Sequence, residues 1–161
     1  MSQTTITKKT PIDFRTARVE VEVKINGDRK IVWDAMVNQT THWWRKDFLT
    51  RPSKGFHIEP RIGGRMYEDR GDGNGLVWAT VTGIDAPHSI LLTGILTPEF
   101  GGPAHTFFQF TLEPVDDDAT LVKISDTIFG NIDESLAGKM HEGWLALFEG
   151  LRKFVESRKP A

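Results

Sequence analysis

The sequence NIDESLAGKMHEGWLALFEGLRKFVES, from Asn131 to Ser157, repeats large apolar residues at spacings of three and four. This period places side chains along one face of an α-helix; the residues concerned are Leu136, Met140, Trp144, Leu147, Leu151 and Phe154. Charged residues lie mainly on the opposite face, so the pattern predicts one long amphipathic helix with a buried face. Asn131 followed by Glu134 resembles a capping box and would begin the helix there.

Seven strand-like runs precede this helix. The first, ARVEVEVKI from Ala17 to Ile25, alternates apolar and charged residues as a half-buried strand does. A short helix is expected after it, because Asp28 can cap a segment in which Ile31, Val32, Ala35 and Met36 share one face. Six more runs follow between turn signals: KGFHIEP, GGRMYEDRG, LVWATVTGID, SILLTGIL, HTFFQFTLEPV and ATLVKISDTIF.

This order of elements predicts an α+β domain with its helices at the two ends of the chain. The links between successive strands are short, which requires antiparallel pairing. The simplest packing is a curved sheet that wraps around the terminal helix. We expect a single domain over residues 17–158 and, because residues 1–16 are polar and aperiodic, a flexible N-terminal arm before it.

Composition excludes several classes of function. The net charge is −2 with acidic and basic residues mixed along the chain, so neither a nucleic-acid surface nor a membrane surface is predicted. There is no cysteine, and the five histidines show no metal-ligand spacing, so we expect no metal and no disulfide. No glycine-rich cofactor motif occurs in the strand–turn–helix setting it requires, and no cofactor is expected. The lack of an apolar leader favours a cytoplasmic protein.

An ordered series of motifs resembles a known family. These motifs are EPRIGGRMYE (59–68), GLVWATVTGID (75–85), the turn with Pro87, ATLVKISDTIFG (119–130) and GWLALFEGLRKFVE (143–156). Together they resemble the branch of the SRPBCC superfamily, also called START-like or birch-pollen-allergen-like, that is named after the activator of heat-shock protein 90 ATPase. The resemblance covers residues 17–157. The eukaryotic co-chaperone has an additional N-terminal domain for which this sequence has no room.

The resemblance implies a helix-grip fold: a seven-stranded antiparallel sheet around a long C-terminal helix, with two short helices after the first strand. Relatives hold lipids, polyketides or other apolar molecules between helix and sheet, and a minority catalyse cyclisation or dehydration there. The superfamily also gives the expectation of a stress-related role. Fold alone does not fix function, because sites are built on such folds independently.

The strand and helix periods predict which side chains face the space under the helix. Trp43, Trp44 and Phe48 are expected to cover one mouth of a cavity, and the loop TPEFGGPA (97–104) to form another rim. Trp78 has the opposite phase to Val77 and Ala79, so we expect it on the outside of the sheet. The full set of expected ligand-contacting residues is Trp43, Trp44, Phe48, Met66, Glu68, Val77, Ala79, Phe108, Phe110, Asp126, Met140, Trp144 and Phe148.

Glu68 and Asp126 are the candidate catalytic residues. A carboxylate in an apolar space has a raised pKa, which suits acid or base chemistry. The alternative is a structural role, in which each carboxylate pairs with Arg61, Arg65, a tryptophan N–H or water, since buried polar groups usually have partners.

Three functions remain open. The favoured one is a non-catalytic protein that binds a small apolar or amphipathic molecule, for which the aromatic set is suited. The second is an interaction protein that contacts a chaperone. The third is a cyclase- or dehydratase-like enzyme that uses Glu68 and Asp126. Apolar residues expected on the outside of the sheet, such as Phe107 and Trp78, also offer a contact for a homodimer.

Overall fold

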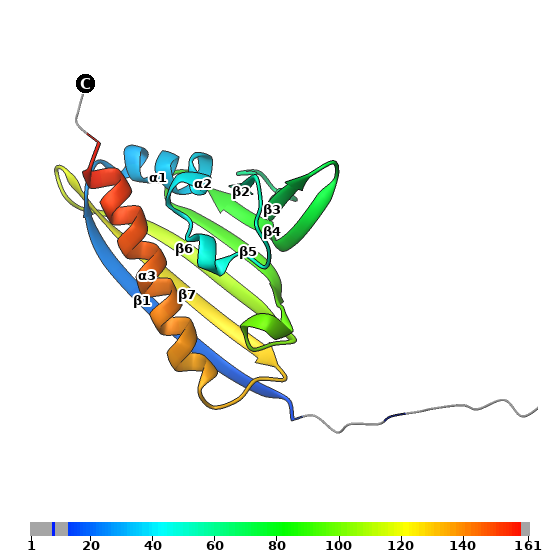
Figure 1. Ribbon diagram of the computed structural model, residues 1–161. Helices are drawn as coiled ribbons and strands as arrows, with labels where there is room; N and C mark the ends of the chain where they lie inside the picture. Colours follow the sequence, from blue (N-terminus) through cyan, green and yellow to red (C-terminus); the bar gives the residue numbers. More distant parts are fainter. Residues whose placement is uncertain (1–7, 9–12, 159–161) are drawn as a thin grey trace, which may run out of the picture.

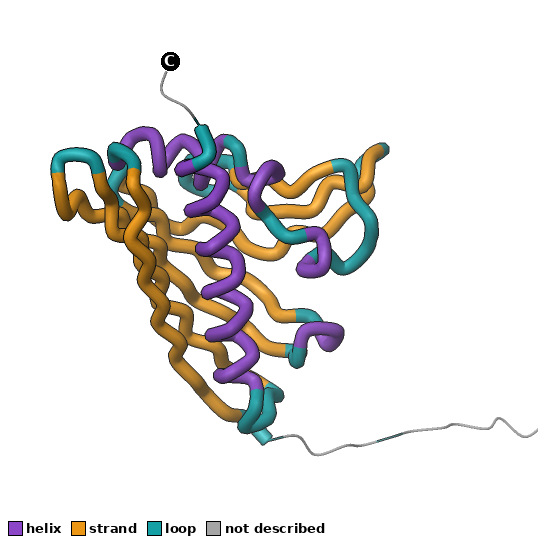
Figure 2. Tube along the Cα trace, turned by 60° about the vertical axis from the view of Figure 1, so that its left-hand side comes forward, coloured by secondary structure: helices purple, strands orange, loops and turns teal. Residues whose placement is uncertain are grey.

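The computed structural model describes residue 8 and residues 13–158. In it a seven-stranded antiparallel sheet curves around one long helix (Figures 1 and 2). The spatial order of the strands is β1-β7-β6-β5-β4-β3-β2. The strands are β1 (Arg15–Asn26), β2 (Gly55–Ile58), β3 (Arg65–Gly71), β4 (Asn74–Asp85), β5 (Ser89–Leu96), β6 (Ala104–Asp116) and β7 (Ala119–Gly130).

Helices occur at both ends of this order, as predicted. Helices α1 (Arg29–Asn38) and α2 (Thr40–Trp43) follow β1, and α3 (Leu136–Glu156) closes the fold. Two 3₁₀ helices, η1 (Lys46–Phe48) and η2 (Pro98–Phe100), lie in connecting segments. The α+β helix-grip architecture inferred from the sequence is therefore confirmed.

Two predicted boundaries differ from the structure. Helix α3 begins at Leu136, and no capping box forms between Asn131 and Glu134; instead the Asp133 carboxylate accepts hydrogen bonds from the N–H and hydroxyl of Ser135. Strand β1 begins at Arg15, inside the segment expected to be an arm, because it pairs with β7 along its whole length. Most of that expected arm, residues 1–7 and 9–12, lies outside the described residues.

The apolar face of α3 is buried as its period predicts. Trp144, Phe148 and Leu151 pack in one core with residues from the concave side of the sheet. Burial of such side chains contributes on the order of 1.5–3 kcal/mol each. The backbone of α3 lies chiefly beside β1 and near α1 and α2. The short helices η1 and η2 lie on the same side of the sheet as α3, away from β1 (Figures 1 and 2).

A bulge in β4 reverses the predicted direction of two side chains. Met66 pairs with Ala79, but the next residue of β3, Tyr67, pairs with Val77, so Trp78 is an extra residue in the ladder. Val77 is consequently 43% exposed, and Trp78 turns toward the concave side, where it contacts the core. The expectation that Val77 points inward and Trp78 outward is wrong, because one extra residue exchanges the two faces of a strand.

The bulge depends on a close backbone approach at Gly94 of β5. A Cβ atom at this position would lie 2.0 Å from the carbonyl oxygen of Trp78 and 2.8 Å from the Cα of Ala79. Only a residue without a side chain fits beside this strand.

We predict that Gly94→Ala lowers the free energy of unfolding by about 2–3 kcal/mol, because the added methyl group forces the strands apart. The matched control is Gly83→Ala, whose Cβ would meet only the Leu91 side chain at 3.5 Å. That variant should be as stable as the parent or up to about 1 kcal/mol more stable. Urea denaturation of both variants measures the difference, and equal midpoints would contradict the role of Gly94.

Candidate functional site

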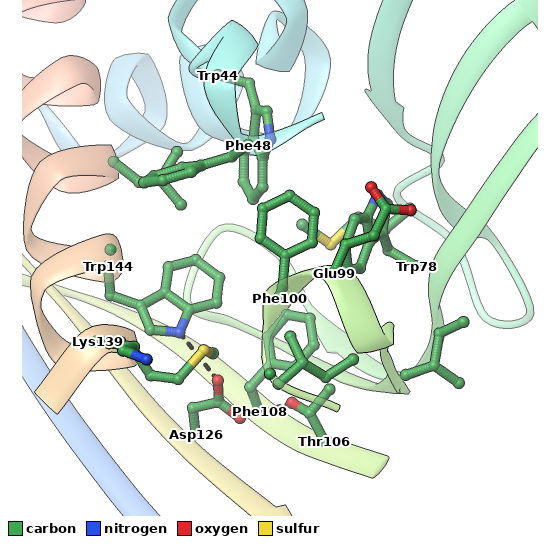
Figure 3. Close-up of a pocket in the computed structure, with 17 residues that line it drawn as sticks. Trp44, Phe48, Trp78, Glu99, Phe100, Thr106, Phe108, Asp126, Lys139 and Trp144 are labelled. Atoms are coloured by element: carbon green, nitrogen blue, oxygen red, sulfur yellow. Dashed lines mark hydrogen bonds between the residues drawn. The ribbon is translucent and has the colours of Figure 1, made fainter. Parts of the chain in front are cut away.

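A pocket of about 370 Å³ opens between α3, η1, η2 and the strands beneath them (Figure 3). Its lining is mostly apolar and contains six aromatic rings. The residues around it are Trp44, Phe48, Met66, Trp78, Ile95, Leu96, Glu99, Phe100, Gly101, Thr106, Phe108, Asp126, Lys139, Met140, Gly143, Trp144 and Leu147.

The aromatic walls are held by packing from several elements. Trp44, directly after α2, stacks on Phe56 with ring centroids 4.1 Å apart and meets Trp144 edge-on at 6.2 Å. Phe100 of η2 approaches Trp78 edge-on at 5.4 Å. Such pairs prefer stacked or edge-to-face geometry, so each ring restrains its neighbour. The walls of the pocket are therefore preformed.

Gly143 leaves room at the pocket wall formed by α3. A Cβ atom there would lie 3.8 Å from the ring of Phe48, which is ordinary van der Waals contact. A larger side chain at this position would extend toward the opening between α3 and η1. The helix backbone does not require a glycine at position 143, but the small residue leaves space at the opening between α3 and η1, as an access route would need.

Asp126 of β7 places a carboxylate at the inner end of the pocket (Figure 3). Its side chain accepts a hydrogen bond from the Thr106 hydroxyl at 2.6 Å and another from the indole N–H of Trp144 at 2.9 Å. The residue is 1% exposed. Burial raises the pKa of Asp126, and the hydrogen bonds from Thr106 and Trp144 oppose this rise only in part.

Glu68 of β3 is buried in a different environment and does not line the pocket. Its carboxylate accepts hydrogen bonds from the N–H and hydroxyl of Thr50, from the indole of Trp78 and from Arg70. Burial alone would raise the pKa of Glu68, but these hydrogen bonds outweigh it and lower the pKa. The cluster joins the loop after η1 to β3 and β4 and orients Trp78.

The two candidate carboxylates therefore do not face one cavity. Each carboxylate accepts a hydrogen bond from a tryptophan indole N–H, which is one of the partners expected for a structural role. Arg61 and Arg65 serve neither, because both lie beside Glu59 at the surface.

The expected ligand-contacting residues divide into two groups. Seven lie around the pocket: Trp44, Phe48, Met66, Phe108, Asp126, Met140 and Trp144. The other six do not; Trp43, Glu68, Ala79, Phe110 and Phe148 are buried elsewhere and Val77 is exposed. Trp43 is held in the core by a hydrogen bond from its indole to the carbonyl of Ala35.

Several residues of the pocket were not anticipated. Thr106 shares the inward phase of Phe108 and could have been found by extending that alternation along β6. Lys139 was expected on the polar face of the helix, yet it lies at the pocket, because the rim extends beyond the apolar stripe. Glu99 and Phe100 belong to the loop predicted to form a rim. His141, near the apolar stripe of α3, is exposed and is not part of the lining.

Charge in the pocket is confined to three side chains. Lys139 on α3 and Glu99 on η2 lie on opposite sides of the pocket, and Asp126 is deeper (Figure 3). Within the described part of the chain, no group of three or more His, Asp or Glu side chains is close enough to hold a metal ion.

The fold and the pocket define a helix-grip protein of the SRPBCC superfamily. More specifically, the chain belongs to the family described as activator of Hsp90 ATPase homolog 1-like protein, whose model matches residues 26–156. No curated protein sequence matches the chain.

Solved structures show the same fold at low sequence identity. Protein MLL2253 from Mesorhizobium loti is 18% identical, with a TM-score of 0.66 and coverage of 89% of this chain and 100% of its own. CalU16 from Micromonospora echinospora is 13% identical, with a TM-score of 0.61 and coverage of 89% and 86%. Norcoclaurine synthase from Thalictrum flavum, solved with dopamine and hydroxybenzaldehyde, is 13% identical, with a TM-score of 0.56 and coverage of 99% and 100%.

Among the helices of the described residues, none combines the length and apolar character needed to cross a membrane.

We predict that Glu68→Gln lowers the free energy of unfolding by roughly 3 kcal/mol at pH 7, because it leaves the partly buried Arg70 without its counter-charge. The lowered pKa of Glu68 means that its contribution is present above the ordinary value of 4.5 and is lost as the pH falls through the folded value. Urea midpoints of the variant and the parent should therefore converge in acid. Glu59→Gln, in the surface pair with Arg65, is the control and should lose much less stability at pH 7.

Asp126→Asn should behave in the opposite way. A raised pKa stabilises the folded state at low pH, and this contribution is lost as the pH rises through the folded value. The variant, which carries no charge, is therefore expected to be at least as stable as the parent in urea at pH 7. Asp133→Asn provides the contrast: the hydrogen bonds from Ser135 lower the pKa of Asp133, so this variant should be less stable than the parent at pH 7. A large loss of stability in Asp126→Asn at pH 7 would contradict this assignment.

Proposed function

We propose that the protein binds a small apolar or amphipathic molecule in the pocket between the sheet, α3 and the two rim helices. The single observation that carries this proposal is the preformed, aromatic-lined cavity of about 370 Å³. Ligand sites in proteins have volumes of about 300–1,000 Å³ and combine apolar walls with a few polar groups. The pocket has this composition.

The buried carboxylate supports a binding role over simple core packing. Asp126 accepts a hydrogen bond from the Trp144 indole, and an apolar residue at position 126 would leave that indole without an acceptor. An apolar residue would, however, avoid the cost of burying a charge. A polar pair retained at the end of an apolar cavity is typical of sites where binding opposes stability. A protein of the same fold, norcoclaurine synthase, was solved with small aromatic molecules, which is consistent with this use of the fold.

The description of the family favours a second candidate, contact with a chaperone of the Hsp90 class. Such contact does not require an empty cavity. An enzyme of the cyclase or dehydratase type has less support. Glu68 is engaged by Thr50, Trp78 and Arg70 outside the pocket, so of the two candidate catalytic carboxyls only Asp126 lines it.

Native mass spectrometry of the gently purified protein tests the binding proposal. We expect a bound mass that organic extraction removes, since an apolar ligand survives mild purification. Gly143→Leu should abolish this added mass, because the new side chain extends from the α3 wall toward Phe48 and narrows the opening. Gly138→Leu is the matched control: it lies on the same helix, its Cβ would meet no atom within 4 Å, and it should retain the mass.

Two outcomes would count against binding in this pocket. One is an added mass that Gly143→Leu retains as fully as the parent does. The other is a clean apo mass together with no fluorescence increase of Nile red, a neutral apolar dye, in the parent protein. Either result would shift weight to the chaperone-contact candidate.

A further inference from the structure

The only charged side chain deep in the described pocket is the Asp126 carboxylate, and no basic residue contacts it. We propose that the natural ligand is an aromatic or alicyclic molecule with a protonated amine, and that this amine binds against Asp126 and Thr106. This inference rests on the proposed function and names the chemical class of ligand for the same site.

The hydrogen-bond inventory at Asp126 favours a donor on the ligand. The Thr106 hydroxyl and the Trp144 indole N–H each donate a hydrogen bond to the carboxylate. Neither proton remains for a ligand. An ionised carboxylate has about four lone-pair positions and the hydroxyl oxygen has two, so this end of the pocket retains acceptor capacity only. A ligand group that donates several hydrogen bonds is the complement of such a surface.

The charge of Asp126 favours a ligand donor group that is positively charged. Burial of an ionised carboxylate without a counter-charge is costly, and a ligand ammonium would supply the missing charge. Hydrogen bonds between charged groups are also roughly twice as strong as neutral ones. A protonated Asp126 would instead need an acceptor for its own proton, and the observed arrangement offers it only donors unless the Thr106 hydroxyl reverses.

The aromatic walls add a second preference for the same charge. Rings of Trp144 and Phe108 lie beside Asp126, with Trp44, Phe48 and Phe100 further along the pocket (Figure 3). The face of an aromatic ring attracts a cation within about 6 Å of its centroid, with Trp the strongest. The same rings stack on an aromatic ligand body. The pocket thus suits a flat apolar body with one cationic end.

Two charged side chains, Lys139 and Glu99, lie on opposite sides of the mouth of the pocket. These two side chains carry opposite charges, so the rim as a whole does not reject either sign. The selectivity for a cation is therefore assigned to the inner end. An anionic ligand group would meet the Asp126 carboxylate there and would be excluded by like-charge repulsion.

Isothermal titration calorimetry with three probes of matched shape tests this assignment. The probes are naphthylethylamine, which is cationic at pH 7, naphthylethanol, which is neutral, and naphthylacetate, which is anionic. We expect the amine to bind the parent protein at least about tenfold more tightly than the alcohol, because its hydrogen bonds are charge-assisted. Naphthylacetate should bind most weakly.

Two variants assign the preference to a residue. Asp126→Asn should reduce the preference for the amine over the alcohol to less than about threefold, since it removes the charge and keeps the shape. Glu99→Gln removes the other carboxylate of the pocket and should leave the preference unchanged. The comparison of the three probes on the parent protein holds even if Asp126→Asn does not fold.

The possible results distinguish a failure of the amine assignment from a failure of small-molecule binding as such. If the alcohol or the acid binds as tightly as the amine, the amine class is overturned while small-molecule binding stands. If the preference for the amine disappears in Glu99→Gln and persists in Asp126→Asn, the assignment to Asp126 is overturned. If no probe binds, the inference of an aromatic amine is overturned, and the mass-spectrometry experiment with Gly143→Leu decides the proposed function independently.

Discussion

The position of α3 on the sheet is the constraint on which the rest of the structure depends. Its apolar face must be buried, and it achieves this chiefly beside β1, with α1 and α2 against its C-terminal half. A single helix is too narrow to cover the concave face of a seven-stranded sheet. The remaining area is closed by aromatic side chains from η1, η2 and the loop after α2. The pocket is the space that these short elements leave.

Hydrogen bonds then determine how the apolar space is divided. The bond from the Trp144 indole to Asp126 joins α3 to β7 across the pocket, and the Glu68 cluster joins the loop after η1 to β3 and β4. The two carboxylates have opposite pKa shifts because their partners differ. Glu68 has a guanidinium and several donors, whereas Asp126 has two neutral donors and no cation. Both carboxylates join elements of the fold, but only that of Asp126 faces the pocket.

The local features of the sequence explain which positions could be predicted. A period of two in a strand, or of 3.6 in a helix, persists along a regular element, so the burial of Phe108 on β6 and Trp144 on α3 followed from their spacing. Val77 and Trp78 were misplaced because the bulge in β4 depends on contact with neighbouring strands, and the absence of a side chain at Gly94 permits that contact. Phe110 and Phe148 have the correct phase but lie in packed core, since phase does not say whether the space opposite a side chain is filled.

The sequence by itself determined the order of the elements, the antiparallel pairing and the amphipathic closing helix, because these depend on periodicity and short links between neighbours in the chain. The motifs also identified the family. Only the tertiary structure decided that Asp126 and not Glu68 lies in the pocket, that Trp78 turns inward, and that Lys139 and Glu99 lie on opposite sides of the mouth. The physical reason is that a cavity and its charges are made by side chains distant in sequence, whose relative positions are set by packing.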